Sequence, residues 1–142
     1  MNIRKAVIED MDILIKLRLD FLIDDRGYLS HDQETAIYAQ LLIYFEKHIN
    51  RDFIATLAEK DGNVVSAAFL AITEKPANPS FINGITATLL NVYTYPEYRR
   101  MGIATKVISQ LLEEAKKYGV SSIDLFATEP KCTAMRLQLF KT

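Results

Sequence analysis

The sequence predicts a mixed β-sheet with helices on both faces, formed by one domain that spans residues 1–142. Three observations indicate this α/β fold class. Residues 85–93, 103–118 and 122–127 have the patterns of a strand, a helix and a strand, which is typical of a crossover between parallel strands. Residues 53–58 and 64–72 flank Asp61-Gly62, a typical hairpin turn between antiparallel strands. Residues 85–93 are almost continuously apolar, which favours a central strand buried on both faces.

The N-terminal part is expected to form a short strand and two helices. Residues 3–6 are short and apolar, and the acidic residues after them are typical of a helix start. Apolar residues then recur at helical spacing from Met11 to Leu22, with Arg18 in the same stripe, and this helix is expected to end near residues 24–27. Ser30 and Gln33 have the spacing of a capping box, which predicts a second helix to about residue 49.

The C-terminal half supplies the remaining elements. After the hairpin, residues 74–84 contain Pro76 and Pro79 and are expected to form a loop. The helix at residues 103–118 has one apolar side and is expected to stop at Gly119. After the strand at residues 122–127, residues 131–140 are expected to be helical. The predicted order is therefore β-α-α-β-β-β-α-β-α.

Composition restricts the class of protein. Apolar residues make up 49% and charged residues 25% of the 142 residues, as in ordinary soluble domains. The formal net charge of −1 gives no electrostatic reason to expect binding to nucleic acid or to an anionic membrane. The single cysteine, Cys132, excludes an internal disulfide and fits a reducing compartment. We expect neither a signal peptide nor a spanning helix, and therefore a cytoplasmic protein.

The most informative stretch is residues 95–105, which read YPEYRRMGIAT between a strand and a strongly periodic helix. The first N–H groups of a helix have no partner inside it and point along the positive end of its dipole. Gly102 would let a phosphate approach the main chain, Ala104 keeps the next turn low, and Arg99 and Arg100 add positive charge. The stretch therefore predicts an anion site that suits a pyrophosphate.

This stretch and its flanking elements closely resemble the acyl-CoA motif of the GNAT acetyltransferase superfamily. The family signature is Arg or Gln, two residues, Gly, one residue, and Gly or Ala, and Arg99, Gly102 and Ala104 occupy these positions. The predicted element order from residue 1 to about residue 130 is also similar to that of the family. The resemblance implies a GNAT-like acyl-CoA acyltransferase fold and acetyl-CoA as the cosubstrate.

The resemblance also implies which residues hold the cofactor and what reaction follows. By position, the pyrophosphate would be held at Arg99 and by the main-chain N–H groups of Arg100, Met101, Gly102, Ile103, Ala104 and Thr105. The amides of the pantetheine arm would pair, like an additional strand, with the backbone of Val92, Tyr93 and Thr94. A primary amine of a small molecule or peptide would attack the thioester directly, so the chain would be an N-acetyltransferase.

Candidate catalytic residues follow from the same comparison. The N–H of Val92 or Tyr93 would donate to the developing oxyanion, and Tyr93 and Asn91 are the side-chain candidates. Tyr93 is equally compatible with a core aromatic residue, and the polar Asn91 with a sheet bulge.

Fewer sequence features bear on the acceptor pocket and on metal binding. Asp24, Asp25 and Glu34 fall where the family places its acceptor pocket; they suit a cationic amine but are equally compatible with solvated loop acids. His31 and His48 have no partner at metal-ligand spacing, so no metal is expected. Direct transfer requires no covalent intermediate, so Cys132 is expected to be inert packing.

The last segment departs from the family pattern. Lys131 stands roughly where the family has Asn, and Arg136 where it has the Tyr that protonates the leaving thiolate. The chain ends at Thr142, about where a closing strand would begin; a shortened variant, a truncated or altered chain, and a homodimer that completes the sheet all account for this. The alternative function is a non-catalytic acyl-CoA-binding or interaction module. The chain lacks Gly-x-Gly-x-x-Gly and Gly-Lys-Ser/Thr loops, which argues against other nucleotide-binding α/β proteins.

Overall fold

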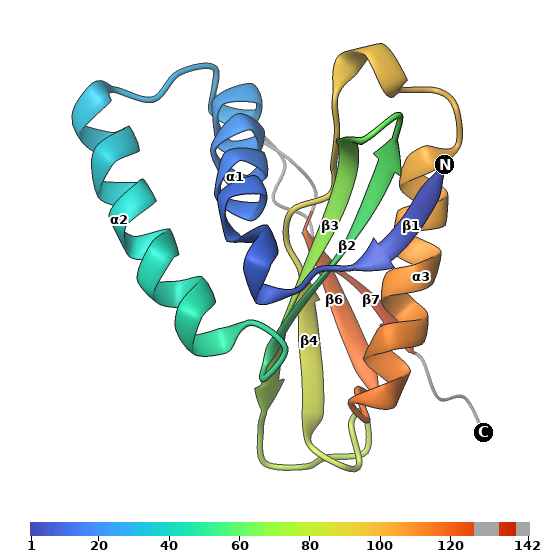
Figure 1. Cartoon of the computed structure of the whole chain (residues 1–142). Coiled ribbons are helices and arrows are strands. Elements are labelled where there is room, and N and C mark those ends of the chain that lie inside the picture. Colours follow the sequence, from blue (N-terminus) through green and yellow to red (C-terminus); the bar gives the residue numbers. More distant parts are fainter. Residues whose placement is uncertain (127–133, 139–142) are drawn as a thin grey trace.

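The computed structural model in Figure 1 describes residues 1–126 and 134–138, and it confirms the mixed sheet with helices on both faces. The strands are β1 (Asn2–Lys5), β2 (Phe53–Lys60), β3 (Asn63–Glu74), β4 (Ile85–Leu89), β5 (Tyr93–Thr94), β6 (Ser122–Phe126) and β7 (Ala134–Gln138). The helices are α1 (Met11–Arg26), α2 (His31–His48) and α3 (Ile103–Lys117), with short 3-10 turns η1 (Ile8–Asp10) and η2 (Pro96–Tyr98). In the described chain the sheet order is β1-β2-β3-β4-β6-β7, with β5 paired to β3. Strands β4 and β6 are parallel, and the other strand pairs of the described residues are antiparallel.

The two faces of the sheet are covered by different helices. Helices α1 and α2 pack on one face and α3 packs on the other (Figure 1). Along β2, Phe53 and Ala55 join the cluster with α1 and α2, whereas Ile54 and Ala58 join the cluster with α3. Successive side chains of a strand point to opposite faces. Strand β2 is therefore buried on both sides, and it forms the centre of two hydrophobic layers.

Helix α3 has the most regular amphipathic pattern in the chain. Ile103, Val107, Leu111 and Ala115 recur every four residues and are at most 3% exposed. This spacing places them on one side of a helix, as the sequence predicted. The hydroxyl of Thr56 on β2 also donates to the carbonyl of Val107 at 2.8 Å. Helix α3 is therefore fixed against the sheet, and so is the loop that precedes its first turn.

The strand predicted at residues 85–93 is divided in two. Strand β4 pairs with one half of β3, from Leu70 to Glu74, whereas β5 pairs with Ser66 and Ala67 in the other half. Residues 90–92 between them lie outside the ladder. Strand β4 continues alongside β6, but within the described residues β5 has a strand partner on its β3 side only. The sheet is therefore open beside β5.

The helix predicted at residues 131–140 is wrong. Residues Ala134–Gln138 form β7, which pairs antiparallel with β6 from Ser122↔Gln138 to Phe126↔Ala134. A short run with several apolar residues does not distinguish a helix from a strand by its period, and the free edge of β6 offers backbone groups for pairing. The predictions made for residues 127–133 and 139–142, including those for Lys131 and Cys132, concern residues outside the described part of the chain.

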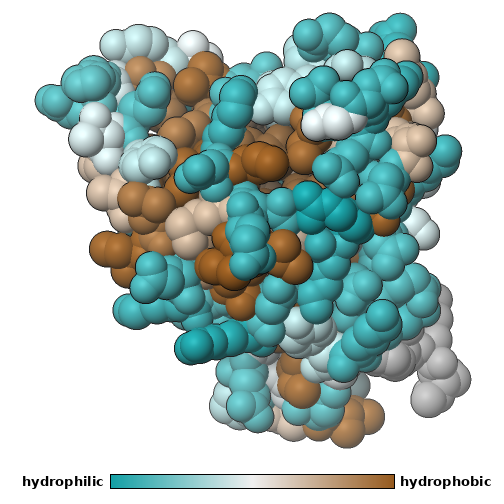
Figure 2. Space-filling view, viewed as in Figure 1, coloured by the Kyte–Doolittle hydropathy of each residue, from teal (hydrophilic) through white to brown (hydrophobic). Residues whose placement is uncertain are grey.

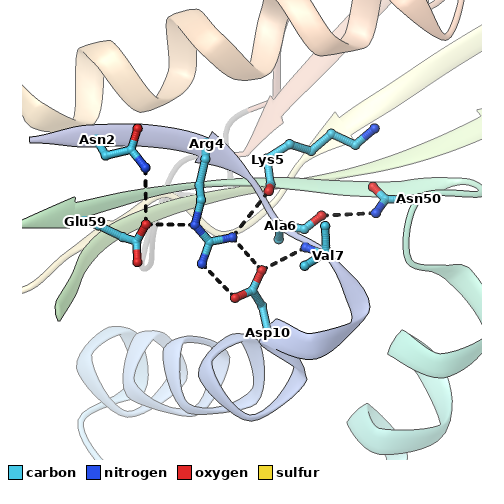
Figure 3. A network of polar contacts seen from close by, with 8 residues as sticks. All are labelled: Asn2, Arg4, Lys5, Ala6, Val7, Asp10, Asn50 and Glu59. Carbon is cyan, nitrogen blue, oxygen red and sulfur yellow. Dashed lines mark hydrogen bonds and ion pairs between the residues drawn. The ribbon is translucent and has the colours of Figure 1, made fainter. Parts of the chain in front are cut away.

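A network of polar contacts attaches the start of α1 to the edge of the sheet (Figure 3). Arg4 of β1 donates to both carboxylate oxygens of Asp10, at 2.7 and 2.8 Å, and to Glu59 of β2 at 2.8 Å. Asp10 also accepts from the backbone N–H of Val7 at 2.8 Å. The guanidinium of Arg4 and these hydrogen bonds lower the pKa of Asp10. The network therefore fixes how α1 leaves β1, and with it the helix that borders the candidate site.

Candidate active site

The turn between η2 and α3, residues 99–105, is here called the cradle. Arg100 has φ of 65° and Gly102 has φ of 75°, so two nearby residues adopt the left-handed conformation. Left-handed residues in a tight turn direct successive backbone N–H groups toward one side and form an anion-binding concavity. The local conformation of the chain is therefore suited to an anion.

The N–H groups of the cradle are free of competing acceptors. Among the described residues, no acceptor is found for the N–H groups of residues 100–105, and the first helical bond is from Lys106 to the carbonyl of Gly102. A cavity of about 260 Å³, the cradle cavity, lies over this turn and is lined by Thr94, Tyr98, Arg99, Arg100, Gly102, Ile103, Ala104 and Thr105. A Cβ placed on Gly102 would meet no atom within 4 Å. Unpaired donors, a helix N-terminus and open space fit a pyrophosphate group.

Arg99 connects the cradle to two other elements. Its Nε donates to the carbonyl of Thr94 on β5 at 2.7 Å, and its Nη2 lies 3.5 Å from Oδ2 of Asp24 on α1. The guanidinium also lies 5.5 Å from the centre of the Tyr93 ring. Arg99 therefore holds β5 and the end of α1 in place beside the cradle, in addition to supplying charge.

A second cavity, the inner cavity, extends from the cradle toward α1. It has a volume of about 380 Å³ and is lined by Phe21, Asp24, Asp25, Val92, Tyr93, Thr94, Arg99 and Ala104. Thr94, Arg99 and Ala104 border both cavities, so the two lie next to each other. The structure thus brings together the open edge of β5, the cradle and the two carboxylates at the end of α1. Glu34, in the first turn of α2, is not among the lining residues.

Tyr93 belongs both to the core and to the cavity wall. Its side chain is 8% exposed, and its ring makes edge-on contacts with Tyr95 and Phe21, at centroid distances of 5.1 and 6.4 Å. Burial, with a contribution from the charge of Asp24, raises the pKa of Tyr93. The phenol is therefore protonated at neutral pH, which disfavours a role as general base.

Asn91 lies in the gap between β4 and β5 and is 1% exposed. Its Oδ1 accepts from Nη1 of Arg18 at 3.2 Å, and the same Nη1 donates to the carbonyl of Leu90 at 3.2 Å. Within the described residues, Nδ2 of Asn91 has no partner. The sequence predicts a role for Asn91 but does not reveal that Arg18 is its partner. The one sign of such a partner is that Arg18, a charged residue, lies in the apolar stripe of α1.

A second polar cluster next to β5 was also missed from the sequence. The hydroxyl of Tyr95 donates to Asp20 on α1 at 2.5 Å, and Lys16 contacts both groups, at 3.2 and 2.7 Å. Burial and the bond to Asp20 raise the pKa of Tyr95 to about 12. The cluster joins α1 to the chain just after β5, and no local pattern reveals it because the partners are far apart in sequence.

Metal ions and membranes receive no support from the described part of the chain. Across residues 1–126 and 134–138, no three His, Cys, Asp or Glu side chains gather as a metal would require. His48 instead contacts Asp52 at 2.7 Å, four residues along the chain. None of the described helices has the length and apolar content needed to cross a membrane. The absence of a metal stays a prediction.

Comparison with known proteins gives one consistent result. Residues 17–138 match the model of the Acetyltransferase (GNAT) family. Over 74 residues the chain is 30% identical to an uncharacterized N-acetyltransferase, ycf52, of Pyropia yezoensis; the match covers 52% of this chain and 38% of that protein. The chain therefore spans less than half of this curated relative.

Solved structures extend the similarity to most of the chain. A predicted acetyltransferase with acetyl-CoA from Clostridium acetobutylicum is 29% identical, with a TM-score of 0.80, over 90% of this chain and 81% of that one. A GCN5-related N-acetyltransferase from Ralstonia eutropha has the same fold, with a TM-score of 0.75 at 20% identity, over 90% of this chain and 84% of that one.

Proposed function

Because this chain belongs to the Acetyltransferase (GNAT) family, we propose that it transfers the acetyl group of acetyl-CoA to a primary amine of a small molecule or peptide. The observation that carries the proposal is that the cradle cavity and the inner cavity adjoin and share three lining residues. A pyrophosphate site alone would suit many nucleotides. A pyrophosphate site that opens onto an unpaired strand edge suits coenzyme A, whose long arm carries amides.

The described residues fit this substrate. The pyrophosphate would be held by the N–H groups of residues 100–105, with Arg99 and Arg100 supplying positive charge. The pantetheine amides would pair with the free edge of residues 92–94. The N–H of Tyr95 donates to the carbonyl of Val65 on β3, and backbone groups alternate in direction along an antiparallel strand. By this alternation the N–H of Thr94 faces the open edge, whereas that of Tyr93 faces β3. Val92 lies just before β5 and outside the ladder, and among the described residues its N–H has no backbone acceptor.

This register favours one of the two oxyanion donors predicted from the sequence. An N–H that faces the open edge can donate to the thioester oxygen, and one engaged with β3 cannot. We therefore assign the N–H of Val92, rather than that of Tyr93, as the donor. The developing negative charge would be stabilised there by a backbone N–H that directly precedes β5.

The transfer itself exchanges one bond for another. An acceptor that arrives as an ammonium ion first gives one proton to water. The neutral amine then forms a C–N bond to the acetyl carbon, the C–S bond breaks, coenzyme A leaves as its thiolate, and the nitrogen gives a second proton to water. Asp24 and Asp25, at the end of α1 in the inner cavity, would attract a cationic amine toward the site. The chain's contribution is thus positioning and charge stabilisation.

Gly102→Glu tests the cofactor assignment. Its carboxylate would enter the cradle cavity opposite the pyrophosphate, so we expect acetyl-CoA binding to be lost in calorimetry. Gly62→Glu is the matched control, because Gly62 also has a positive φ of 80° and no atom within 4 Å of an added Cβ, but lies in the β2–β3 turn. Equal affinity of Gly102→Glu and Gly62→Glu for acetyl-CoA would contradict the assignment.

The alternative is a non-catalytic module that binds acyl-CoA. Its motivation is the sequence comparison, in which Arg136 stands roughly where the family has its thiolate-protonating Tyr; the structure places Arg136 in β7 rather than in the helix expected there. Acetyl-CoA binding without thiol release across a broad amine panel would support this alternative. Turnover of any amine would exclude it.

A further inference from the structure

A groove between α1 and α2, here called the helix groove, is separate from the two cavities described above. It consists of two hollows of about 410 and 210 Å³, which share Arg18, Gln40 and Leu41. Figure 2 shows apolar patches among polar residues on the side formed by α1 and α2, and mostly polar surface on the side formed by β1 and α3. In the smaller hollow the apolar lining includes Phe45 and Phe69. The helix groove is therefore a recess with apolar walls and a few polar groups, as ligand sites commonly are.

Arg18 is the central polar group of this groove. Its guanidinium lies 5.8 Å from the centre of the Phe21 ring, and Nη1 is held by the carbonyl of Leu90 and by Asn91. Among the described residues no carboxylate lies within ion-pair distance of Arg18, and its Nε and Nη2 make no hydrogen bond. Burial lowers the pKa of Arg18, yet an arginine side chain stays charged at neutral pH. Arg18 is thus a half-buried cation; the charge of Asp25 acts against the lowering of its pKa, but from beyond ion-pair distance, so the guanidinium can accept a closer counter-ion.

The charges that line the helix groove have one sign. Arg18 and Arg26 are its charged lining residues in the described chain, and they are accompanied by Gln33 and Gln40. The carboxylates Asp24 and Asp25 border the inner cavity instead. The end of α1 thus separates a cationic groove from an anionic cavity wall. A ligand with both a positive and a negative group would match this arrangement.

The groove also lies close to the point of transfer. Leu90 and Asn91, which hold Arg18, directly precede Val92, so the guanidinium lies within about 10 Å of the edge of the inner cavity. Asn91 itself is 1% exposed and lines neither hollow of the groove, so it acts on a ligand only through Arg18. A molecule with its amine in the inner cavity would have to extend past residues 90–92 to present a second group to Arg18.

We propose that the helix groove binds a carboxylate of the acceptor, so that the substrate is an amine that also carries a carboxylate, such as a short peptide or an amino acid. The free nitrogens of Arg18 form the planar fork that a carboxylate accepts in two parallel hydrogen bonds. The assignment rests on the proposed acetyl transfer and specifies its acceptor.

The first test compares each acid with its amide. Thiol release from acetyl-CoA is measured with glycine oligopeptides and ω-amino acids, and with the C-terminal amide of each. We expect kcat/KM for the best acid to exceed that for its amide by about tenfold or more. Amides that are used as well as the acids would overturn the proposal, even though acetyl transfer itself would then be established.

Substitutions of Arg18 test whether this residue causes the preference for the acid over its amide. Arg18→Met is expected to bring the acid-to-amide ratio near one, mainly by raising KM for the acid, and Arg18→Lys to retain part of it because charge remains without the fork. Arg51→Met, at an exposed arginine outside the groove, is the control and should leave the ratio unchanged. A folded Arg18→Met protein that keeps the preference would contradict the assignment. If Arg18→Met does not fold, the wild-type ratio and Arg18→Lys decide.

A binding measurement separates this proposal from the proposed function. If no amine in the panel releases thiol, the transfer proposal fails, and calorimetry with N-acetyl-diglycine and its amide in the presence of CoA tests the groove directly. At least tenfold tighter binding of the acid, lost in Arg18→Met or weakened in Arg18→Lys, supports it. Equal affinity, or no binding of either compound, overturns it.

Discussion

Replacing Asp10 by Asn tests the network that fixes α1 to the sheet. Asp10 accepts two hydrogen bonds from Arg4 and one from Val7, and its side chain is 8% exposed, whereas that of Arg4 is 30% exposed. Breaking a fully buried ion pair costs about 3–5 kcal/mol. Arg4 keeps its bond to Glu59 and partial access to water, so we expect a loss of about 2 kcal/mol in the free energy of unfolding.

The pH dependence of this loss follows from the direction of the pKa shift. The pKa of Asp10 is lower in the folded protein than its ordinary value of about 3.9, so the folded state binds the proton less tightly than the unfolded state. The stabilisation is therefore complete above about pH 4 and is lost as pH falls through the folded-state pKa. Urea unfolding of both proteins from pH 7 to pH 3 should show the difference between wild type and Asp10→Asn shrinking below pH 4.

Glu59→Gln is the matched comparison, because Glu59 contacts the same guanidinium from a more exposed position. We expect a smaller loss of stability from this variant than from Asp10→Asn. Equal losses, or a difference for Asp10→Asn that stays constant down to pH 3, would refute the account of the network.

Two further predictions concern stability. Gly84→Ala should destabilise the protein by more than about 1 kcal/mol, because φ is 75° and the added Cβ would lie 2.2 Å from the carbonyl oxygen of Lys75. Gly27→Ala should cost less, because Gly27 has a similar φ of 84° but open space around the added Cβ. Equal losses of stability in urea unfolding would contradict the steric argument. Tyr95→Phe removes the bond to Asp20 and should cost about 1 kcal/mol. Because the pKa of Tyr95 is raised to about 12, this difference from wild type should be complete below about pH 10 and decline toward pH 12; a difference that grows over this range would refute the assignment.

Local sequence patterns predicted most of the elements correctly. The capping box of Ser30 and Gln33 forms as expected, with Ser30 accepting from the N–H of Gln33 at 3.1 Å and Gln33 from that of Ser30 at 2.9 Å. Asp61 and Gly62 both adopt positive φ, of 52° and 80°, as a tight hairpin turn requires. These features depend on neighbouring residues alone, which is why the sequence reveals them.

The wrong or missed features depend on distant partners. The division of the strand at residues 85–93 places Asn91 beside Arg18, 73 residues earlier. The strand at Ala134–Gln138 forms by pairing with β6, and its short apolar run has no decisive period of its own. The cradle was predictable from its motif, but the inner cavity arises only where α1 meets the open edge of the sheet, and the helix groove only where α1 packs beside α2.

The central claim is that the cradle and the open edge of β5 together hold coenzyme A. A crystal structure of the protein with coenzyme A tests it most directly. We predict the pyrophosphate on the N–H groups of residues 100–105 and the pantetheine arm beside residues 92–94, with its sulfur end in the inner cavity. Pyrophosphate bound elsewhere, or an arm that does not follow residues 92–94, would contradict the account.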